Sequence, residues 1–381
     1  MSILFDNVRV YLGGAFFPNQ KVLIEKGKIA AVGSKIHKTA DVIVDAQKKY
    51  LVPGLIDAHT HLTLTDVGRD LEESDIDERF ISITPHIRPL DGLKMRSKVL
   101  SDARAAGISC CMVCPGSMNP ISGLCSIMKT YGNSADVGLI VEQAGIKFSF
   151  GEVPKKQQKL NGKFPQTRMG IVALIRENLM KAQDYLDQKN SKKGLKDRCI
   201  DIEALIPLLE GKVPMRAHAQ RLEDIMTAVR IAEEFNLKII LEHAVEAYKV
   251  ADLLAKKNIP VVLGPILIPD FKSELSEKIF ESATILLDAK VNVALTCDYP
   301  GLPVETLRIA AAMAVQFGLD ERRALECITE NPAKILGLDH RIGQIKKGYD
   351  GDIALFSGTP LDIRSRLEML VIDGEIFDFR K

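Results

Sequence analysis

Residues 51–62 read LVPGLIDAHTHL, an apolar run that ends in His59-Thr60-His61. The run predicts a buried β-strand over Gly54–His61, and Pro53 stands just before it, where it removes no ladder hydrogen bond. Side chains two residues apart on a strand point to the same face, so both imidazoles are expected to point the same way from its end. Two imidazoles held in this way are suited to binding one metal ion.

The composition limits the classes of protein to consider. The chain has 381 residues, of which 46% are hydrophobic, and its formal net charge is +1. This balance predicts one large domain plus a small one, with no charge-driven nucleic-acid or membrane surface. The first residues, MSILFDNVRV, carry charges and resemble no signal peptide, and no uncharged apolar run approaches the ~20 residues of a membrane span. We therefore expect a soluble, cytoplasmic protein.

The cysteines predict no disulfide framework. There are seven of them, an odd number in a large chain, so reduced thiols are expected. Cys111 and Cys114 form a C-x-x-C pattern, but a structural zinc site needs a second pair of ligands, and none follows. Both are interpreted as small buried residues of a strand.

The chain divides into two β-rich ends and a long α/β centre. Residues 1–53 and 341–381 read as short strands that need sheet neighbours, and they are predicted to build one β-sandwich together. Between them, residues 54–340 alternate apolar strands with amphipathic helices, which predicts a TIM (β/α)8 barrel inserted in the sandwich. The eight expected strands are Gly54–His61, Ile108–Cys114, Val137–Val141, Ile146–Gly151, Val213–His218, Lys238–His243, Pro260–Leu263 and Asn292–Asp298.

Residues that suit metal binding stand at the ends of four of these strands. His59 and His61 end the first, His218 the fifth, His243 the sixth and Asp298 the eighth. The carboxyl ends of barrel strands meet at one rim, where active sites of such barrels lie. Unpaired imidazoles and a carboxylate clustered there are costly to desolvate without a cation, so the pattern predicts a metal site.

Several strings resemble the amidohydrolase superfamily, of the type related to imidazolonepropionase. They are PGLIDAHTHL, the strand ends at His218 and His243, TCD at 296–298, and NPAKILGLDHRIGQIKKGYDGDIALFSG at 331–358. The resemblance implies a distorted TIM barrel with a β-sandwich, and one or two divalent metals per chain. It implies that His59 and His61 bind the more buried metal near Asp298, and that His218 and His243 bind the second.

The resemblance also raises the question of a bridging anion from the fourth strand, GIKFSFGEVP. Lys147 stands in a setting like that of the family's carboxylated lysines, and we favour it as a metal ligand. Glu152, at the end of the same strand, is the alternative bridge and needs no modification. If neither binds, the site holds a single metal, but a buried, unpaired lysine is expensive.

The expected chemistry follows from the metals. A metal-bound hydroxide is the implied nucleophile, and Asp298 is the expected base that passes a proton to the leaving nitrogen. His and carboxylate ligands suit zinc, iron, manganese and cobalt alike. Zinc is the metal that we expect, with iron or manganese as alternatives. Single-metal deaminases of the superfamily place a glutamate three residues after the fifth-strand histidine; this chain has Arg221 there, and the nearest acid is Glu223.

The sequence therefore favours a metal-dependent hydrolase of a cyclic or linear, non-peptide C–N bond in a small-molecule substrate. A mononuclear deaminase or a dipeptidase-like hydrolase is the alternative, and a non-catalytic scaffold is a weaker one. Arg216, two residues before His218, is interpreted as a member of a structural ion pair. A homo-oligomer is compatible with the fold, and no feature of the sequence decides it.

Overall fold

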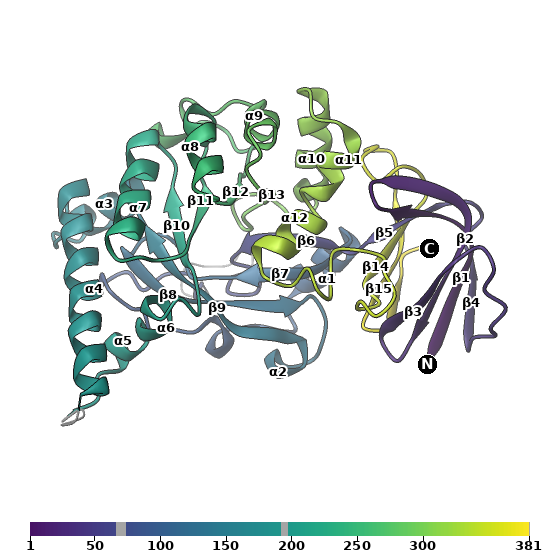
Figure 1. Cartoon of the computed structure of the whole chain (residues 1–381), viewed down its shortest axis with the longest axis horizontal. Helices are drawn as coiled ribbons and strands as arrows, with labels where there is room; N and C mark the ends of the chain where they lie inside the picture. The colour runs from purple at the N-terminus through teal and green to yellow at the C-terminus, as the bar shows by residue number, and fades with distance from the viewer. Residues whose placement is uncertain (66–73, 192–196, 381) are drawn as a thin grey trace.

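The computed structural model describes residues 1–65, 74–191 and 197–380. Within these ranges the chain forms two sheets of eight strands each. Both chain ends lie in one sheet at one end of the molecule, and the central part of the chain builds the other sheet with its helices (Figure 1).

The sheet at the chain ends confirms that both ends of the chain build one separate β element. Its order is β16-β15-β14-β5-β1-β2-β3, and β4 pairs in parallel with β1. The two ends of the chain meet where β5 and β14 pair antiparallel, with Pro53 opposite Ile353. The strands are β1 (Ser2–Leu12), β2 (Ala15–Glu25), β3 (Lys28–Gly33), β4 (Val42–Asp45), β5 (Tyr50–Pro53), β14 (Ile353–Phe356), β15 (Leu367–Ile372) and β16 (Glu375–Asp378).

The second sheet is a nearly closed, distorted barrel, as expected from the sequence. Its strands follow the order β13-β12-β11-β10-β9-β8-β7-β6. They are β6 (Leu55–Thr60), β7 (Ile108–Val113), β8 (Ile121–Lys129), β9 (Leu139–Ser149), β10 (Met215–Ala219), β11 (Ile239–His243), β12 (Val261–Leu263) and β13 (Val293–Leu295).

The strand count was right, but two of the assigned strands were wrong. Val137–Val141 and Ile146–Gly151 were predicted as separate strands, whereas one long strand, β9, covers most of both. The missing strand is β8, which runs antiparallel to β7 and to β9, so this part of the barrel is a meander without crossover helices. Every residue of β8 is buried, so its sequence lacks the alternation that marks a strand.

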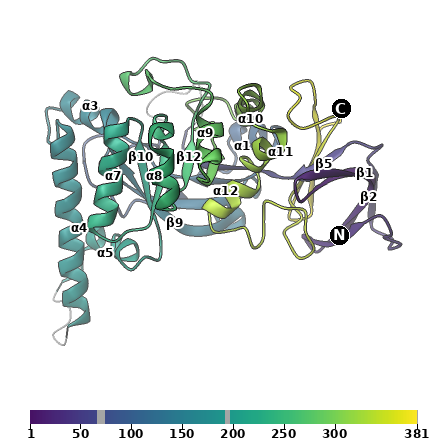
Figure 2. The same cartoon turned by 45° about the horizontal axis from the view of Figure 1, so that its top comes forward.

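Helices cover the outside of the parallel strands (Figure 2). Among the described residues they are α1 (Lys98–Ala105), α2 (Ala135–Gly138), α3 (Glu152–Leu160), α4 (Arg168–Asn190), α5 (Ile200–Glu203), α6 (Ile206–Leu209), α7 (Leu222–Glu234), α8 (Ala251–Lys256), α9 (Ser282–Asp288), α10 (Thr306–Gln316), α11 (Glu321–Glu326) and α12 (Glu330–Ile335). Short 3-10 turns occur at η2 (Pro89–Asp91), η3 (Ala247–Val250) and η4 (Ser273–Leu275). Of the helices described, none has the length and apolar character needed to cross a membrane.

The barrel closes between β6 and β13 through side chains. The buried Asp57 carboxylate accepts hydrogen bonds from the backbone N–H groups of His59 (3.1 Å) and Cys297 (3.1 Å). The hydroxyl of Thr296 donates to the His59 carbonyl at 2.6 Å. These contacts hold the strand that carries His59 against the segment that carries Asp298.

A buried ion cluster joins the barrel to the terminal sheet. Lys129, at the end of β8, places its ammonium 2.7 Å from Asp350, 2.9 Å from Asp352 and 2.6 Å from Asp373. The Lys129 side chain is 2% exposed. Burial raises the pKa of Asp352 to about 6. Burial also raises the pKa of Asp350. The positive charges of Lys129, Lys28 and Arg341 outweigh this effect and lower the pKa of Asp350 to about 2.

Lys129→Met is expected to lower the free energy of unfolding by about 3–5 kcal/mol, because it leaves buried carboxylates without their counter-ion. Urea unfolding followed by circular dichroism measures this change. Lys28→Met is the matched control, since Lys28 pairs with the same Asp350 from a half-exposed position and is expected to cost about 1 kcal/mol or less. Equal losses in the two variants would contradict a special role for the buried lysine.

Candidate metal centre

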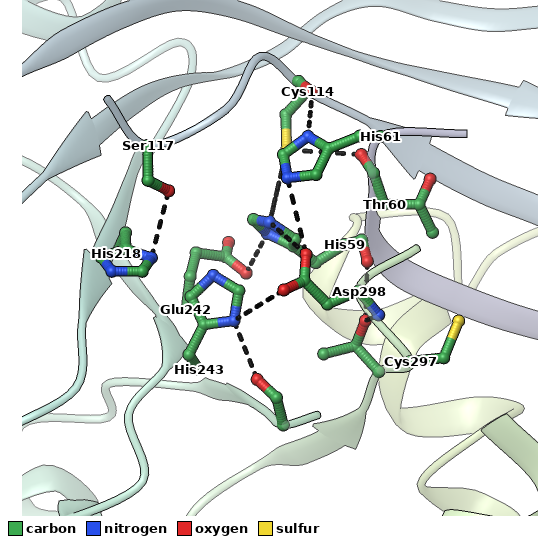
Figure 3. Close-up of polar contacts among 12 residues, drawn as sticks. His59, Thr60, His61, Cys114, Ser117, His218, Glu242, His243, Cys297 and Asp298 are labelled. Atoms are coloured by element: carbon green, nitrogen blue, oxygen red, sulfur yellow. Dashed lines mark hydrogen bonds and ion pairs between the residues drawn. The ribbon is translucent and has the colours of Figure 1, made fainter. Parts of the chain in front are cut away.

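The candidate site lies at the carboxyl ends of the barrel strands (Figure 3). His59 lies on β6, with His61 directly after that strand; His218 lies on β10, His243 ends β11 and Asp298 follows β13. Ligand atoms of His59, His243 and Asp298 all lie within 4.8 Å of one another. The Nε2 atom of His61 is 3.5 Å from Asp298 Oδ1, and the Nε2 atom of His59 is 3.6 Å from the same oxygen.

In each of the four imidazoles, the Nδ1 atom has a hydrogen-bond partner outside the proposed metal position. His61 Nδ1 lies 2.7 Å from the Cys114 carbonyl, and His243 Nδ1 lies 2.8 Å from the Gly264 carbonyl. A carbonyl only accepts, so in both rings Nδ1 carries the hydrogen and Nε2 keeps a free lone pair. His59 Nδ1 lies 2.8 Å from a Glu242 oxygen, and His218 Nδ1 lies 3.1 Å from the Ser117 hydroxyl. Imidazoles held by outer partners in this way are typical of metal-binding histidines.

The two residues that complete the cluster have left-handed backbones. The φ angle is +68° at His243 and +53° at Asp298. Residues other than glycine adopt this backbone conformation only at a cost in free energy. At Asp298 the backbone N–H donates to the Thr296 hydroxyl at 2.9 Å, which holds the turn. The turned backbone lets His243 and its neighbour Glu242 both face the site, which a regular strand does not allow.

Glu242 is a site residue that the sequence analysis missed. Its carboxylate contacts the His59 imidazole on one side and the Arg216 guanidinium on the other, and both charged side chains are buried. Arg216 also donates to the Ala58 carbonyl at 2.8 Å, in keeping with the structural ion pair expected of it. The pair thus fixes both the ring orientation and the backbone of the strand that carries His59.

The structure separates the two candidates for a bridging ligand. Lys147, fully buried on β9, places its Nζ 3.1 Å from His59 Nε2. Glu152, the first residue of α3, instead accepts from the Ser273 hydroxyl (2.7 Å) and the Glu274 backbone (3.1 Å). This position favours Lys147, since the Glu152 carboxylate is engaged beside η4 and not with His59.

Cys114 is the second residue that the sequence analysis missed. It is buried, as expected of it, but its sulfur faces the site and lies 3.5 Å from His59 Nε2 and 4.0 Å from Lys147 Nζ. Burial opposes ionisation of this thiol. A hydrogen bond with Cys125 and the neighbouring charges of His59 and Lys147 nevertheless hold its pKa well below the usual range. The C-x-x-C pattern alone carried no signal of this environment.

A divalent cation fits this set of donors. Asp298 Oδ1 and His218 Nε2 are both buried, and neither has a hydrogen-bond partner within residues 1–65, 74–191 and 197–380. Buried polar atoms are normally satisfied, so orphaned ligand atoms in one cluster indicate a missing partner. Burial, reinforced by nearby positive groups, lowers the pKa of His218 and of His243 well below the usual range, which keeps both rings neutral as metal binding requires.

Glu242→Gln is expected to weaken metal binding by about 10–100-fold, because the amide cannot take up the role of the carboxylate that orients His59. Competition between the protein and a chromophoric chelator measures the dissociation constant. Glu223→Gln provides a control, since the Glu223 side chain is 70% exposed on α7. Unchanged affinity in Glu242→Gln would contradict the orienting role.

The fold and this rim define a class: barrel hydrolases whose active site is built from histidines and carboxylates at the strand ends. The family model described as amidohydrolase family matches residues 212–378. The solved structure of an amidohydrolase from Thermotoga maritima MSB8 is 38% identical, covers 99% of this chain and 100% of that one, and superposes with a TM-score of 0.95. The chain belongs to the amidohydrolase family, and so to the hydrolases and deaminases that act on C–N bonds.

Two further relatives show the breadth of this family. The amidohydrolase tasK of Hapsidospora irregularis is 26% identical over 402 residues, which cover 97% of this chain and 41% of that protein. This chain thus spans less than half of tasK. The imidazolonepropionase of Pseudoalteromonas atlantica is 25% identical over 364 residues, which cover 89% of this chain and 86% of that enzyme. The second match agrees with the resemblance noted in the sequence.

Proposed function

We propose that the protein is a metal-dependent amidohydrolase that hydrolyses a C–N bond of a small, non-peptide amide, cyclic or linear. One observation carries the proposal. Four buried imidazoles, at His59, His61, His218 and His243, have their Nδ1 atoms engaged by outer partners, beside the orphaned oxygen of Asp298. Such an array is suited to a divalent cation and has no evident structural purpose without one.

The proposed ligands fall into two groups. His59, His61 and Asp298 would hold one cation, and His218 and His243 a second, with zinc the expected metal and iron or manganese the alternatives. A bound divalent cation supplies an activated water and polarises the carbonyl under attack. Lys147 would be a ligand in its carboxylated form. Its amine faces His59 Nε2, the nitrogen that would bind the first cation, and as an ammonium it would repel that cation. Carboxylation replaces this positive charge by an anion.

The remaining chemistry falls to the side chains of the chain. Asp298 lies between the imidazoles, with Oδ1 near His59 and His61 and Oδ2 3.9 Å from His243 Nδ1. From this position its carboxylate takes a proton from the attacking water and delivers it to the leaving nitrogen. Glu242 and Arg216, both buried, keep His59 in place during the reaction.

A mononuclear deaminase is the second candidate, and one observation favours it. The tight group of possible ligands is His59, His243 and Asp298, whereas His218 Nε2 faces Glu274 Oε1 at 3.9 Å. Three such ligands can hold a single cation, as a mononuclear deaminase requires. Against a deaminase of this kind stands Arg221, where a proton-shuttling glutamate is expected, with the nearby Glu223 turned to solvent.

The test uses the full chain, stripped with a chelator and then reloaded with zinc. The panel comprises cyclic amides, N-acylated amino acids, dipeptides and amino-substituted heterocycles, with products read by mass spectrometry and ammonia release read separately. Metal-restored hydrolysis of amides without ammonia release is the expected result. Ammonia from the heterocycles would favour the deaminase, and a zinc-loaded protein inert toward the whole panel would favour the scaffold.

We further propose a cytoplasmic location and a small-molecule substrate, with neither a nucleic acid nor a membrane as partner. All seven cysteines are free thiols, which supports a reducing compartment. A homo-oligomer is compatible with the fold, and sedimentation of the purified chain tests it.

A further inference from the structure

We propose that the Cys114 sulfur is a ligand of the cation that His59 binds, so that the metal centre contains a thiolate as well as imidazole and carboxylate donors. The inference rests on the proposed metal centre and adds to it a ligand from a strand end that carries no histidine. A sulfur ligand limits the candidate metals to those that bind thiolate well.

The distance between the sulfur and the nearest imidazole is the first argument. Zinc binds nitrogen at about 2.0–2.1 Å and thiolate sulfur at about 2.3 Å, so two such ligands in tetrahedral positions are separated by about 3.5–3.6 Å. The observed distance from Cys114 Sγ to His59 Nε2 is 3.5 Å. Asp298 Oδ1 lies at a similar distance, 3.6 Å, from the same nitrogen. Sulfur and oxygen thus both lie at spacings suited to sharing one ion with His59.

The backbone around Cys114 fixes this position. Cys114 follows the last residue of β7, its N–H donates to the Thr60 carbonyl at 3.0 Å, and its own carbonyl accepts from His61. Both bonds attach Cys114 to the strand end that carries the two histidines. The side chain is therefore pre-organised toward the site, as Figure 3 shows, and not a chance neighbour of it.

The polar contacts around the sulfur are the second argument. Lys147 is fully buried, and within the described part of the chain its Nζ forms no ion pair with a carboxylate. Its contacts there are His59 Nε2 and, at 4.0 Å, the Cys114 sulfur. The sulfur thus belongs to the same buried group of polar atoms as His59 Nε2, the nitrogen assigned to the cation.

The competing interpretation is structural. Cys114 Sγ also lies 3.5 Å from the Thr60 carbonyl, to which a neutral thiol can donate a weak hydrogen bond. In that case the sulfur only packs against the site. The two interpretations differ in the electronic spectrum of the metal-loaded protein, since only a sulfur bonded to the metal produces ligand-to-metal charge transfer.

The experiment loads the full chain with Co²⁺ under nitrogen, with a phosphine as reductant so that no added thiol binds the metal. Wild-type protein is expected to show visible d–d bands from bound cobalt and a near-ultraviolet sulfur-to-cobalt band. Cys114→Ser is expected to lose the near-ultraviolet band while it keeps the visible ones. Cys199→Ser, which changes an exposed sulfur, is expected to keep both.

The failures are distinguishable. Visible bands without the near-ultraviolet band in wild type would overturn the Cys114 proposal and leave the proposed metal centre intact, and so would a near-ultraviolet band that survives in Cys114→Ser. Absence of all bands, with no cobalt retained, would overturn the proposed function itself. If Cys114→Ser fails to fold, Cys114→Ala replaces it, and the wild-type spectrum still decides whether sulfur binds the metal.

Discussion

Asp298→Asn is expected to lower kcat/KM by about 10²–10⁴-fold, the range associated with loss of a positioned acid–base group. Asparagine keeps the size of the side chain and its acceptor oxygen but does not take up a proton. The N–H of residue 298 still donates to Thr296, so the left-handed turn at this position is preserved. Steady-state kinetics on the amide found by the substrate panel measures the loss.

The control for this variant is a carboxylate outside the site. Asp270 pairs with Lys278, its side chain is 57% exposed, and Asp270→Asn is expected to leave kcat/KM unchanged. Metal content must be measured in both variants, since Asp298 is also a proposed ligand. A fully metal-loaded Asp298→Asn enzyme with wild-type activity would exclude Asp298 as the proton carrier.

The sequence placed His59 and His218 at the rim because each stands at the end of a short apolar run that forms a strand. Every residue of β6 and β10 is buried, so the apolar run and its end, and not an alternation of side chains, marked these strands. The pairing of the two chain ends was predicted because isolated short strands need sheet partners. In both cases one simple rule about strands was sufficient.

The features that were missed depend on departures from such rules. Alternation places Glu242 opposite His243, yet the left-handed backbone at His243 turns both toward the site. Cys114 gains its role from the strand that lies beside it, and no short-range pattern records that contact. Strand β8 was missed because it is buried on both faces and runs against the parallel order that the helices suggested.

Lys147→Ala is expected to reduce the bound metal from two ions per chain to one or none, whereas Glu152→Ala is expected to keep two. The reason is position: the Lys147 amine lies 3.1 Å from His59 Nε2, while Glu152 is engaged with Ser273 and Glu274. Elemental mass spectrometry on protein purified without chelator measures the content. Reconstitution with and without bicarbonate tests the carboxylation, since a carboxylated lysine needs dissolved carbon dioxide. One ion in all three proteins would instead establish a mononuclear centre, in which Lys147 remains an amine beside the Cys114 sulfur.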